Sequence, residues 1–299
     1  MSTETIKCNL CCNPDYEVVL ESNADWADVE ADAFACTSSY IAKHGRIVRC
    51  TNCGLVYANP RPTQRRIEQL YREVEDKVYL AEEEARIATF RHSLTRLRLH
   101  EQSGRLLDVG CYIGAFLRVA RAGGFETAGV EPSEWASSFA RGRGLDVHTG
   151  SLEDAPFEPG SFDVVTVWDV VEHYADPKSE MLKIRELLRP DGLLAISTMD
   201  VGSFPPRLMR GGWPWYMLMH LYYFTPATLT RMLEDCGYVV VGVEPHVRVL
   251  TVRYAIKKAS SYSPVAGSIA ARVARTLRLD GLRLPLYFGD LFTIYARRT

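Results

Sequence analysis

Residues 105–117 (RLLDVGCYIGAFL) place the strongest constraint on how this chain can fold. Apolar residues surround Asp108, glycines follow at Gly110 and Gly114, and a helical apolar pattern begins at Ala115. This order predicts a strand, a tight turn and a helix. The glycines let the backbone turn and approach a ligand closely, and the first N–H groups of the helix are free to donate hydrogen bonds. We therefore expect a nucleotide-like ligand at this turn.

A second strand is expected to end at Glu131. The apolar run 127–130 precedes this acid, which lies about 20 residues after the first strand, the spacing typical of a dinucleotide-binding sheet. An acid at this place in an α/β sheet accepts hydrogen bonds from ribose hydroxyls. The two strands together predict a sheet whose carboxyl edge binds a nucleoside-containing cofactor.

Four segments together resemble the class I S-adenosylmethionine-dependent methyltransferases: LLDVGCYIG (106–114), AGVEPS (128–133), SLEDAPF (151–157) and FDVVTVWDVVEH (162–173). The resemblance implies a Rossmann-like α/β fold, with a seven-stranded sheet whose last strand is antiparallel, and S-adenosyl-L-methionine as the cofactor. The last segment is similar to that of quinone O-methyltransferases. Tyr112 stands where the family usually has the middle glycine of its first motif.

The resemblance assigns the parts of the cofactor to three turns. The first-motif loop would hold the methionine moiety, Glu131 the ribose, and the 151–153 turn the adenine. Ser151 replaces the family's common Asp, so adenine recognition is expected to use backbone groups and packing on Leu152. The full expected set is Asp108, Gly110, Cys111, Tyr112, Gly114, Glu131, Pro132, Ser151, Leu152, Glu153 and Asp169.

Acids and a histidine follow the next expected strand, residues 162–168. Asp169, Glu172 and His173 come at its carboxyl end, where open α/β sheets bind ligands. A histidine beside two acids can act as a general base or can join them as a ligand to a divalent metal. The alternative is that Glu172 and His173 cap the next helix and orient the loop. His220, which precedes LYYFTP, resembles a residue near the transferred methyl in this group and is the second candidate base.

Aromatic residues alternate with glycine and proline in the region 201–226. This composition predicts an ordered aromatic loop rather than a regular element, and loops of this kind often select substrates. The rings could stack on a sugar or planar ring or form a lid, although half of them could be core residues. The expected substrate-binding residues are Trp213, Trp215, Tyr216, Tyr222 and Tyr223.

The N-terminal residues 1–62 contain two Cys-x-x-Cys pairs, formed by Cys8, Cys11, Cys50 and Cys53. Each pair can place two thiolates on one tetrahedral zinc ion, so we expect a zinc ribbon with a structural role. The alternative is four reduced cysteines in a small β unit, but a segment of this size has little core without metal. The connection 12–49 is long for a ribbon, and its acidic part, residues 25–32, is expected to be an inserted loop.

The remaining residues, 63–299, alternate helical and strand patterns, as expected for a methyltransferase domain. Thr63, Ser133 and Thr225 can cap helices, and the sequence PDG at 190–192 is typical of a turn. One expected helix begins at residue 63. The other expected helices span 80–104, 133–143, 178–189 and 225–237. The expected strands are 106–109, 127–130, 145–149, 162–168, 193–198, 238–243 and 286–298.

The overall charge gives the protein no general attraction for nucleic acid, since the formal net charge is −2. One basic stretch, 246–283, is typical of a solvated helix face, but it could attract a phosphorylated substrate or make weak contact with an anionic membrane surface. The N-terminus lacks an apolar signal core and the chain lacks a long apolar run, so we expect a cytoplasmic protein.

These patterns favour O-methylation of a small molecule or glycan precursor, with His173 or His220 taking the proton. The sequence does not indicate which oligomeric state the protein adopts. One rival is an RNA methyltransferase that uses the zinc ribbon and the basic stretch. The other is a catalytically inactive, zinc-stabilised interaction protein, an alternative that Tyr112 and Ser151 leave open.

Overall fold

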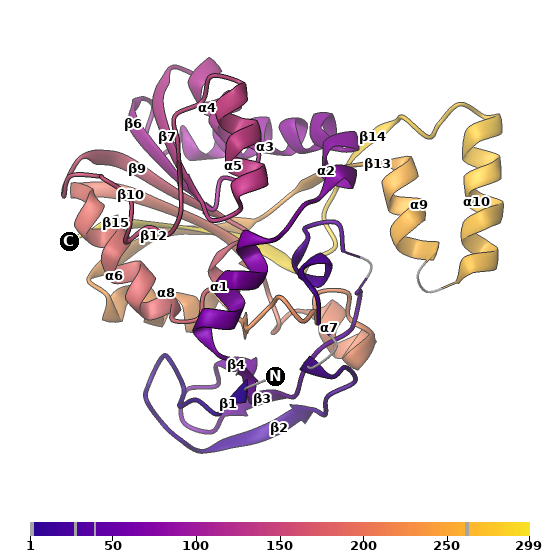
Figure 1. Ribbon diagram of the computed structural model, residues 1–299, viewed down its shortest axis with the longest axis horizontal. Coiled ribbons are helices and arrows are strands. Elements are labelled where there is room, and N and C mark those ends of the chain that lie inside the picture. The colour runs from indigo at the N-terminus through magenta and orange to yellow at the C-terminus, as the bar shows by residue number, and fades with distance from the viewer. Residues whose placement is uncertain (1–2, 27–28, 39, 261–262) are drawn as a thin grey trace.

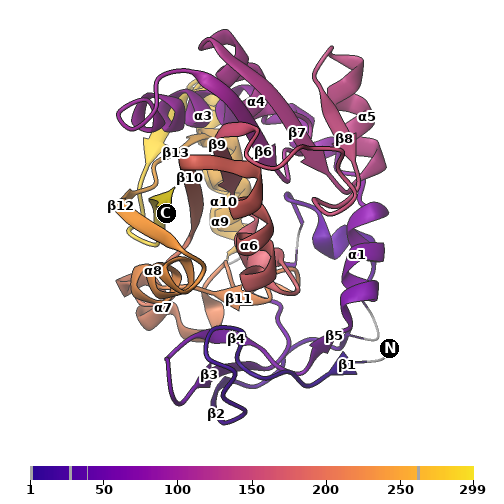
Figure 2. The ribbon, with the colours of Figure 1, turned by 90° about the vertical axis from the view of Figure 1, so that its left-hand side faces the viewer.

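The computed structural model describes all residues except 1–2, 27–28, 39 and 261–262. A seven-stranded sheet forms the centre of the molecule, and a smaller N-terminal unit lies below it in both views (Figures 1 and 2). The order of the strands in the large sheet is β12-β15-β10-β9-β6-β7-β8. Its strands are β6 (Gly104–Val109), β7 (Phe125–Glu131), β8 (Val147–Thr149), β9 (Phe162–Trp168), β10 (Leu188–Met199), β12 (Tyr238–Pro245) and β15 (Leu291–Arg298).

The direction of β15 confirms the expected fold class. β15 runs antiparallel to both of its neighbours, β10 and β12, whereas β6, β7, β8, β9 and β10 are parallel. The sheet is therefore the expected Rossmann-like sheet, in which the last strand of the chain runs antiparallel to its neighbours.

Alternating apolar residues give the sheet two buried faces. In β6, Leu106 packs in one hydrophobic cluster and Leu107 in the other, because neighbouring side chains of a strand point to opposite faces. The face of Leu106 is covered by residues of α3 and α4, and the face of Leu107 by residues of α6 and α8. The helices of the chain are α1 (Gln64–Arg72), α2 (Lys77–Ala81), α3 (Glu83–Leu97), α4 (Ala115–Ala122), α5 (Glu134–Gly142), α6 (Pro177–Leu187), α7 (Phe204–Met209), α8 (Pro226–Asp235), α9 (Val252–Ser260) and α10 (Pro264–Thr276).

Three expected helix starts are found, with different capping contacts. The Ser133 side chain accepts a hydrogen bond from the amide of Ala136 at the start of α5, and Thr225 forms a capping box with Thr228 at the start of α8. Thr63 occupies the N-cap position of α1, but its side chain makes no capping hydrogen bond.

Three expectations about element bounds are wrong. The strand expected over 286–298 begins only at Leu291, as β15. The helix expected over 80–104 is divided into α2 and α3 at Glu82 and ends at Leu97. α2 is a separate helix whose first turn is capped by Asp76, which accepts from the amide of Tyr79. The turn expected at 190–192 lies inside β10, where a register shift and a positive φ of 60° at Asp191 interrupt the strand.

The N-terminal unit contains a four-stranded sheet of order β11-β4-β3-β2 and a short pair of strands, β1 and β5. Its strands are β1 (Thr3–Glu4), β2 (Tyr16–Leu20), β3 (Ile47–Cys50), β4 (Val56–Ala58), β5 (Arg61–Pro62) and β11 (Tyr222–Tyr223). β11 belongs to the region expected to be an irregular loop, which also contains α7 and the 3₁₀ helix η4 (Arg210–Gly212). The prediction that region 201–226 lacks regular elements is therefore wrong. The division of the chain at residue 62 stays a prediction.

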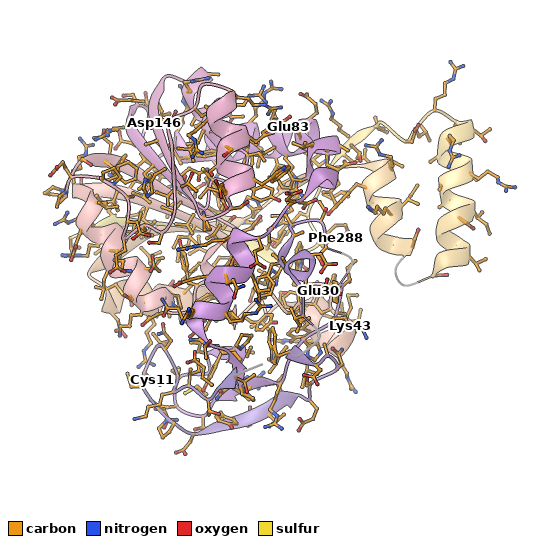
Figure 3. The ribbon with its side chains drawn as sticks, in the orientation of Figure 1. Cys11, Glu30, Lys43, Glu83, Asp146 and Phe288 are labelled. Atoms are coloured by element: carbon orange, nitrogen blue, oxygen red, sulfur yellow. The ribbon has the colours of Figure 1, made fainter. Side chains whose placement is uncertain are left out.

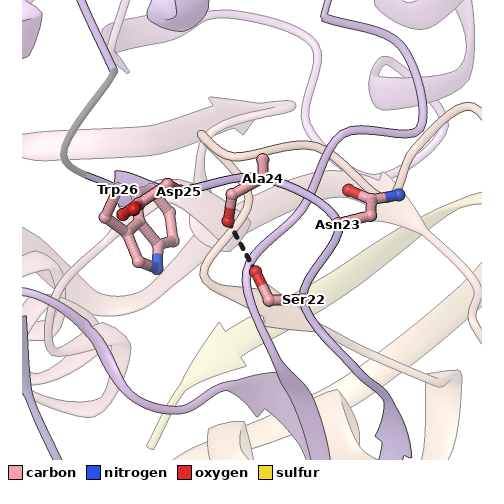
Figure 4. Close-up of a pocket in the computed structure, with 5 residues that line it drawn as sticks. All are labelled: Ser22, Asn23, Ala24, Asp25 and Trp26. Atoms are coloured by element: carbon pink, nitrogen blue, oxygen red, sulfur yellow. Dashed lines mark hydrogen bonds between the residues drawn. The ribbon is translucent and has the colours of Figure 1, made fainter.

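The acidic connection in the N-terminal unit contributes to the core. Trp26 and Val29 are buried, as is Phe34 in the 3₁₀ helix η2 (Ala31–Phe34). Residues 27–28 of the expected inserted loop lie outside the described residues. Figure 4 shows a pocket formed by residues 22–26, in which the Ser22 hydroxyl donates to the carbonyl of Ala24 at 2.6 Å. None of the expected site residues lines this pocket.

The basic stretch forms a separate extension at the side of the sheet. β13 (Arg248–Thr251) pairs with β14 (Arg283–Leu286), and α9 and α10 lie between them in the sequence. Figure 1 shows the two helices side by side and apart from the central sheet. Among the helices of the described residues, none has both the length and the apolar character needed to cross a bilayer.

Candidate active site

The turn between β6 and α4 uses three left-handed residues. Gly110, Tyr112 and Gly114 have φ values of 72°, 50° and 74°. A Cβ atom on Gly110 would lie 2.6 Å from a methyl group of Val170, and one on Gly114 would clash with Leu145. The glycines are therefore needed for both conformation and space, and Tyr112 adopts the left-handed backbone that would suit the missing glycine.

The two central side chains of this turn belong to different clusters. Cys111 packs in the core, where a Cβ on Gly129 would lie 2.6 Å from its sulfur. The Tyr112 ring meets Tyr79 edge-on at 4.6 Å and lies 6.0 Å from Trp135. Among the described residues the buried Tyr112 hydroxyl has no hydrogen-bond partner, and burial raises its pKa. The turn therefore holds one buried donor available to a ligand.

Two buried carboxyls stand at the ends of neighbouring strands. Glu131, which is 5% exposed, accepts hydrogen bonds from the amides of Tyr112 at 2.9 Å and Ser133 at 2.8 Å. Burial raises the pKa of Glu131 to about 7. Asp108 accepts from the Thr166 hydroxyl at 2.7 Å, and burial raises its pKa to about 8. The backbone amides orient Glu131 and leave each oxygen a second lone pair for a ligand.

The side chains of the turn after β8 mostly contact the protein itself. The Ser151 hydroxyl donates to Asp154 at 2.6 Å, and the exposed Glu153 pairs with Lys183 on α6 at 2.9 Å. Leu152 is buried. This arrangement leaves the backbone and the Leu152 side chain as the groups that can meet a planar base.

Asp169 forms an ion pair that the sequence did not predict. Its carboxylate lies 2.5 Å from the Arg248 guanidinium and accepts from the Ser197 hydroxyl at 3.0 Å. Burial alone would raise the pKa of Asp169, but Arg248 and Ser197 lower it below its ordinary value. The Arg248 guanidinium also lies over the Trp215 ring, 4.6 Å from its centre. Arg248 belongs to the basic stretch that was expected from the sequence to be solvated. In the structure, the pairing of β13 with β14 brings Arg248 to the edge of the sheet.

Both candidate histidines are held by hydrogen bonds at their Nδ1 atoms. The Nδ1 atom of His173 lies 2.9 Å from the carbonyl oxygen of Met219 and 2.7 Å from the Tyr71 hydroxyl. The Nδ1 atom of His220 lies 2.7 Å from the carbonyl oxygen of Trp215. A carbonyl oxygen only accepts, so the Nδ1 of His220 carries the proton and its Nε2 keeps a lone pair. The Tyr71 hydroxyl can donate to the Nδ1 of His173 or accept from it, so the contacts of His173 fit either tautomer.

Glu172, His173 and His220 form one cluster, which we call the carboxyl–histidine trio. One ligand atom from each lies within 4.8 Å of the others. Glu172 accepts from the Thr198 hydroxyl at 2.8 Å, and burial together with Asp169 raises its pKa to about 8. Burial lowers the pKa of His173 to about 4 and also lowers that of His220. The trio therefore presents two neutral imidazole nitrogens beside a carboxyl group.

The capping alternative for this segment is wrong. Glu172 and His173 lie in the 3₁₀ helix η3 (Val171–His173), and α6 is capped by Asp176, which accepts from the amide of Ser179. The Tyr71 contact to His173 was not predicted. Its signal was the apolar face of α1, on which Tyr71 lies one turn after the buried residue Ile67.

Most of the expected substrate-binding aromatics are core residues. Four of them are at most 4% exposed: Trp213, Tyr216, Tyr222 and Tyr223. The indole N–H groups of Trp213 and Trp215 both donate to one oxygen of Asp290, at 2.9 and 3.0 Å. The half-buried Trp215 ring lies roughly parallel to that of His220, with centres 6.3 Å apart. The Tyr223 ring also lies beside His220, at 6.4 Å, but it is buried, so Trp215 is the partly exposed ring beside the trio.

The structure brings the two Cys-x-x-Cys pairs together in the N-terminal unit, where Figure 3 labels Cys11. The sulfurs of Cys8 and Cys53 are 3.4 Å apart, and those of Cys11 and Cys50 are 3.5 Å apart. All four lie within 4.8 Å of one another. Around a tetrahedral zinc ion with bonds of ~2.3 Å, sulfurs lie about 3.8 Å apart, so the four residues fit such an ion.

Fold and site define an α/β protein with a nucleotide-type turn at the carboxyl edge of its sheet. A family model described as a methyltransferase domain matches residues 79–243. The chain therefore belongs to this methyltransferase family.

Named relatives match parts of the chain. The ubiquinone biosynthesis O-methyltransferase of Thiobacillus denitrificans is 34% identical over 148 residues, 44% of this chain and 63% of that protein. The protein of the same name from Neisseria meningitidis is 32% identical over 199 residues, 55% of this chain and 79% of that protein. For the relatives from Thiobacillus denitrificans and Aeromonas salmonicida, the match spans less than two thirds of their length.

Solved structures also match. An S-adenosylmethionine-dependent methyltransferase from Thermotoga maritima has a TM-score of 0.49 and 19% identity, covering 73% of this chain and 91% of that chain. Geranyl diphosphate C-methyltransferase from Streptomyces coelicolor has a TM-score of 0.49 and 18% identity, covering 70% of this chain and 79% of that chain.

Proposed function

We propose that this protein transfers a methyl group from S-adenosyl-L-methionine to a small-molecule acceptor. The observation that carries the proposal is the placement of the turn at 110–114, Glu131 and the turn at 151–153 after three neighbouring parallel strands, β6, β7 and β8. Ligands of open α/β sheets bind at this edge. Membership of the methyltransferase family supports the same cofactor.

The residues at this edge fit that cofactor. Glu131 would accept from the ribose hydroxyls with the lone pairs that its two backbone amides leave free. Leu152 would pack against the adenine, and the buried Tyr112 hydroxyl would donate to the methionine carboxylate. When bound, S-adenosyl-L-methionine supplies a methyl group that its positive sulfur makes electrophilic. The residues of the protein then have mainly to position the acceptor in line with that methyl group.

The proposed acceptor is a hydroxyl group. Relatives that carry the name ubiquinone biosynthesis O-methyltransferase support an oxygen acceptor on a small molecule. The partly exposed ring of Trp215, beside His220, offers a surface on which a planar ring or a sugar can stack. We therefore propose hydroxylated rings and glycan precursors as the acceptor classes.

The carboxyl–histidine trio would promote loss of the proton from the acceptor hydroxyl. A histidine with a pKa of about 4 is a weak base at neutral pH, which disfavours His173 as a free general base. One nitrogen from each imidazole and one carboxyl oxygen, all within 4.8 Å of one another, are instead suited to a divalent cation. We propose that the trio binds such a cation, which when bound lowers the pKa of a hydroxyl beside it.

The test is methyl transfer from S-adenosyl-L-methionine to a panel of hydroxylated rings and sugar nucleotides. S-Adenosylhomocysteine should form with a hydroxylated acceptor, stop forming after chelation, and form again after a divalent cation is added. Lack of turnover by protein that still binds S-adenosylhomocysteine would contradict the proposed acceptor classes. Turnover unchanged by chelation would contradict the proposed cation.

We also propose that Cys8, Cys11, Cys50 and Cys53 hold one structural zinc ion. The convergence of the four sulfurs supports this proposal. The unit around them has only short strands, so a metal would supply much of the free energy that orders it.

A further inference from the structure

The last helix of the basic extension directs its large apolar side chains to solvent. Val265, Ile269, Val273 and Leu277 follow one another at intervals of four residues and are 72%, 60%, 51% and 60% exposed. Residues four apart lie on the same face of a helix, so the four form one stripe, which we call the α10 stripe. In Figure 1, α10 is the outermost element on its side of the molecule.

Small residues occupy the other face of α10. Ala274 and Gly267 are buried, and a Cβ atom on Gly267 would clash with Ser260 at the end of α9. The two helices are therefore in close contact through small side chains. The usual amphipathic pattern is reversed, because the larger apolar residues remain outside and available to a partner.

Arginines flank the α10 stripe. Arg272 and Arg275 are exposed and, with Ser268 and Thr276, line a shallow groove of about 350 Å³. In the part of the chain that the structure describes, neither arginine forms an ion pair, whereas Arg253 near the base of the extension pairs with Glu82. The groove thus carries two positive charges that no acid of the described chain compensates.

The charge of the whole extension favours an anionic partner. Residues 246–289 contain eight lysines and arginines and a single acid, Asp280. Three of the arginines, Arg248, Arg253 and Arg283, pair with acids outside the extension. A second copy packed on this face would place arginines opposite arginines, and such like-charge pairs oppose association. A bilayer with anionic headgroups can bury the apolar stripe and neutralise the arginines at the same time.

We propose that α10 docks the protein on an anionic lipid surface. The α10 stripe enters the boundary between headgroups and acyl chains, and Arg272 and Arg275 contact lipid phosphates. This surface does not depend on the proposed methyl transfer, because it uses none of the residues of the candidate active site.

Co-sedimentation of the full chain with vesicles tests the proposal. The protein should sediment with vesicles of mixed phosphatidylglycerol and phosphatidylcholine, not with phosphatidylcholine alone, and high salt should release it. The Arg272→Glu/Arg275→Glu and Ile269→Ser/Val273→Ser proteins should each bind about tenfold more weakly or worse. Both pairs are exposed, so these changes open no cavity.

The Arg65→Glu/Arg72→Glu protein is the matched control. It changes the net charge by the same amount through two exposed arginines of α1, and it should sediment like the natural protein. Failure of the natural protein to bind anionic vesicles, or equal binding by the α10 variants, would overturn the proposal. A concentration-dependent dimer that is lost in the Ile269→Ser/Val273→Ser protein would also overturn it and assign the stripe to a second copy.

Discussion

Replacement of Glu131 by Gln tests the proposed ribose contact in the most direct way. In the natural protein both carboxylate oxygens accept a backbone N–H, from Tyr112 and from Ser133. The substitution keeps the shape of the side chain but turns one acceptor into a donor. One amide then loses its acceptor, and one lone pair is lost to the cofactor.

Two quantities should change. A hydrogen bond to a charged group contributes about 1.5–3 kcal/mol, so the dissociation constant of S-adenosylhomocysteine should rise about 10- to 160-fold. The unpaired buried amide should lower the free energy of unfolding by about 1–3 kcal/mol. Calorimetric titration measures the first effect, and urea denaturation without ligand measures the second.

The pH dependence of the affinity for S-adenosylhomocysteine provides an independent test. Burial raises the pKa of Glu131 to about 7, so the carboxylate is ionised above that pH and protonated below it. Ribose hydroxyls donate to the ionised form. Affinity should therefore be full at higher pH and fall as the pH drops through about 7, by at most about tenfold per pH unit, and this dependence should vanish in the Glu131→Gln protein.

The control is Glu134→Gln, the same chemical change at an exposed position in the first turn of α5. This control should bind S-adenosylhomocysteine as the natural protein does. Equal affinity of the Glu131→Gln and natural proteins, in folded samples at alkaline pH, would refute the ribose assignment.

Three further predictions follow from other parts of the structure. Replacement of Cys50 and Cys53 by Ser should remove about one equivalent of zinc, measured by elemental analysis, and destabilise the N-terminal unit. His173→Ala and His220→Ala should each lower turnover by about 10²-fold or more while leaving the affinity for S-adenosylhomocysteine unchanged. Asp290→Ala should lower the free energy of unfolding in urea by about 2–4 kcal/mol, because two indole N–H groups lose their acceptor.

Each of these predictions has a control and a contrary result. Cys12→Ser changes an exposed cysteine next to the cluster and should keep the zinc, whereas unchanged zinc in the Cys50/Cys53 variant would contradict the metal site. Unchanged turnover in both histidine variants would remove the trio from the reaction. Asp280→Ala is the control for Asp290, and equal stability of the two variants would show that the shared carboxylate contributes little.

Local sequence patterns predicted the central sheet well because its strands are buried on both faces. The apolar strands, the glycines at 110 and 114 and the cap at Ser133 are short-range features, and each is found in the structure. The same patterns missed the break at Glu82. The residues around it have partners far along the chain: the Glu82 carboxylate accepts from the Thr251 hydroxyl at 2.8 Å, and Asp76, which caps α2, also accepts from the amide of Thr37 at 2.9 Å.

The predicted site was less complete where its residues meet partners distant in sequence. His173 and His220 were both candidate bases, and the structure shows them in one cluster, with ring centres 4.9 Å apart. In the sequence, Arg248 could not be distinguished from the other basic residues of its stretch, although in the structure it pairs with Asp169. The aromatic region was misjudged because an indole that stacks on a substrate and one that donates to a buried Asp290 look alike in sequence.

The most direct test of the central claim is calorimetric titration of the folded protein with S-adenosylhomocysteine. The product probes the cofactor site without knowledge of the acceptor. The proposed function predicts one site per chain with a dissociation constant in the micromolar range. Absence of binding by folded protein that contains zinc would contradict it and favour an interaction protein built on an inactive methyltransferase fold.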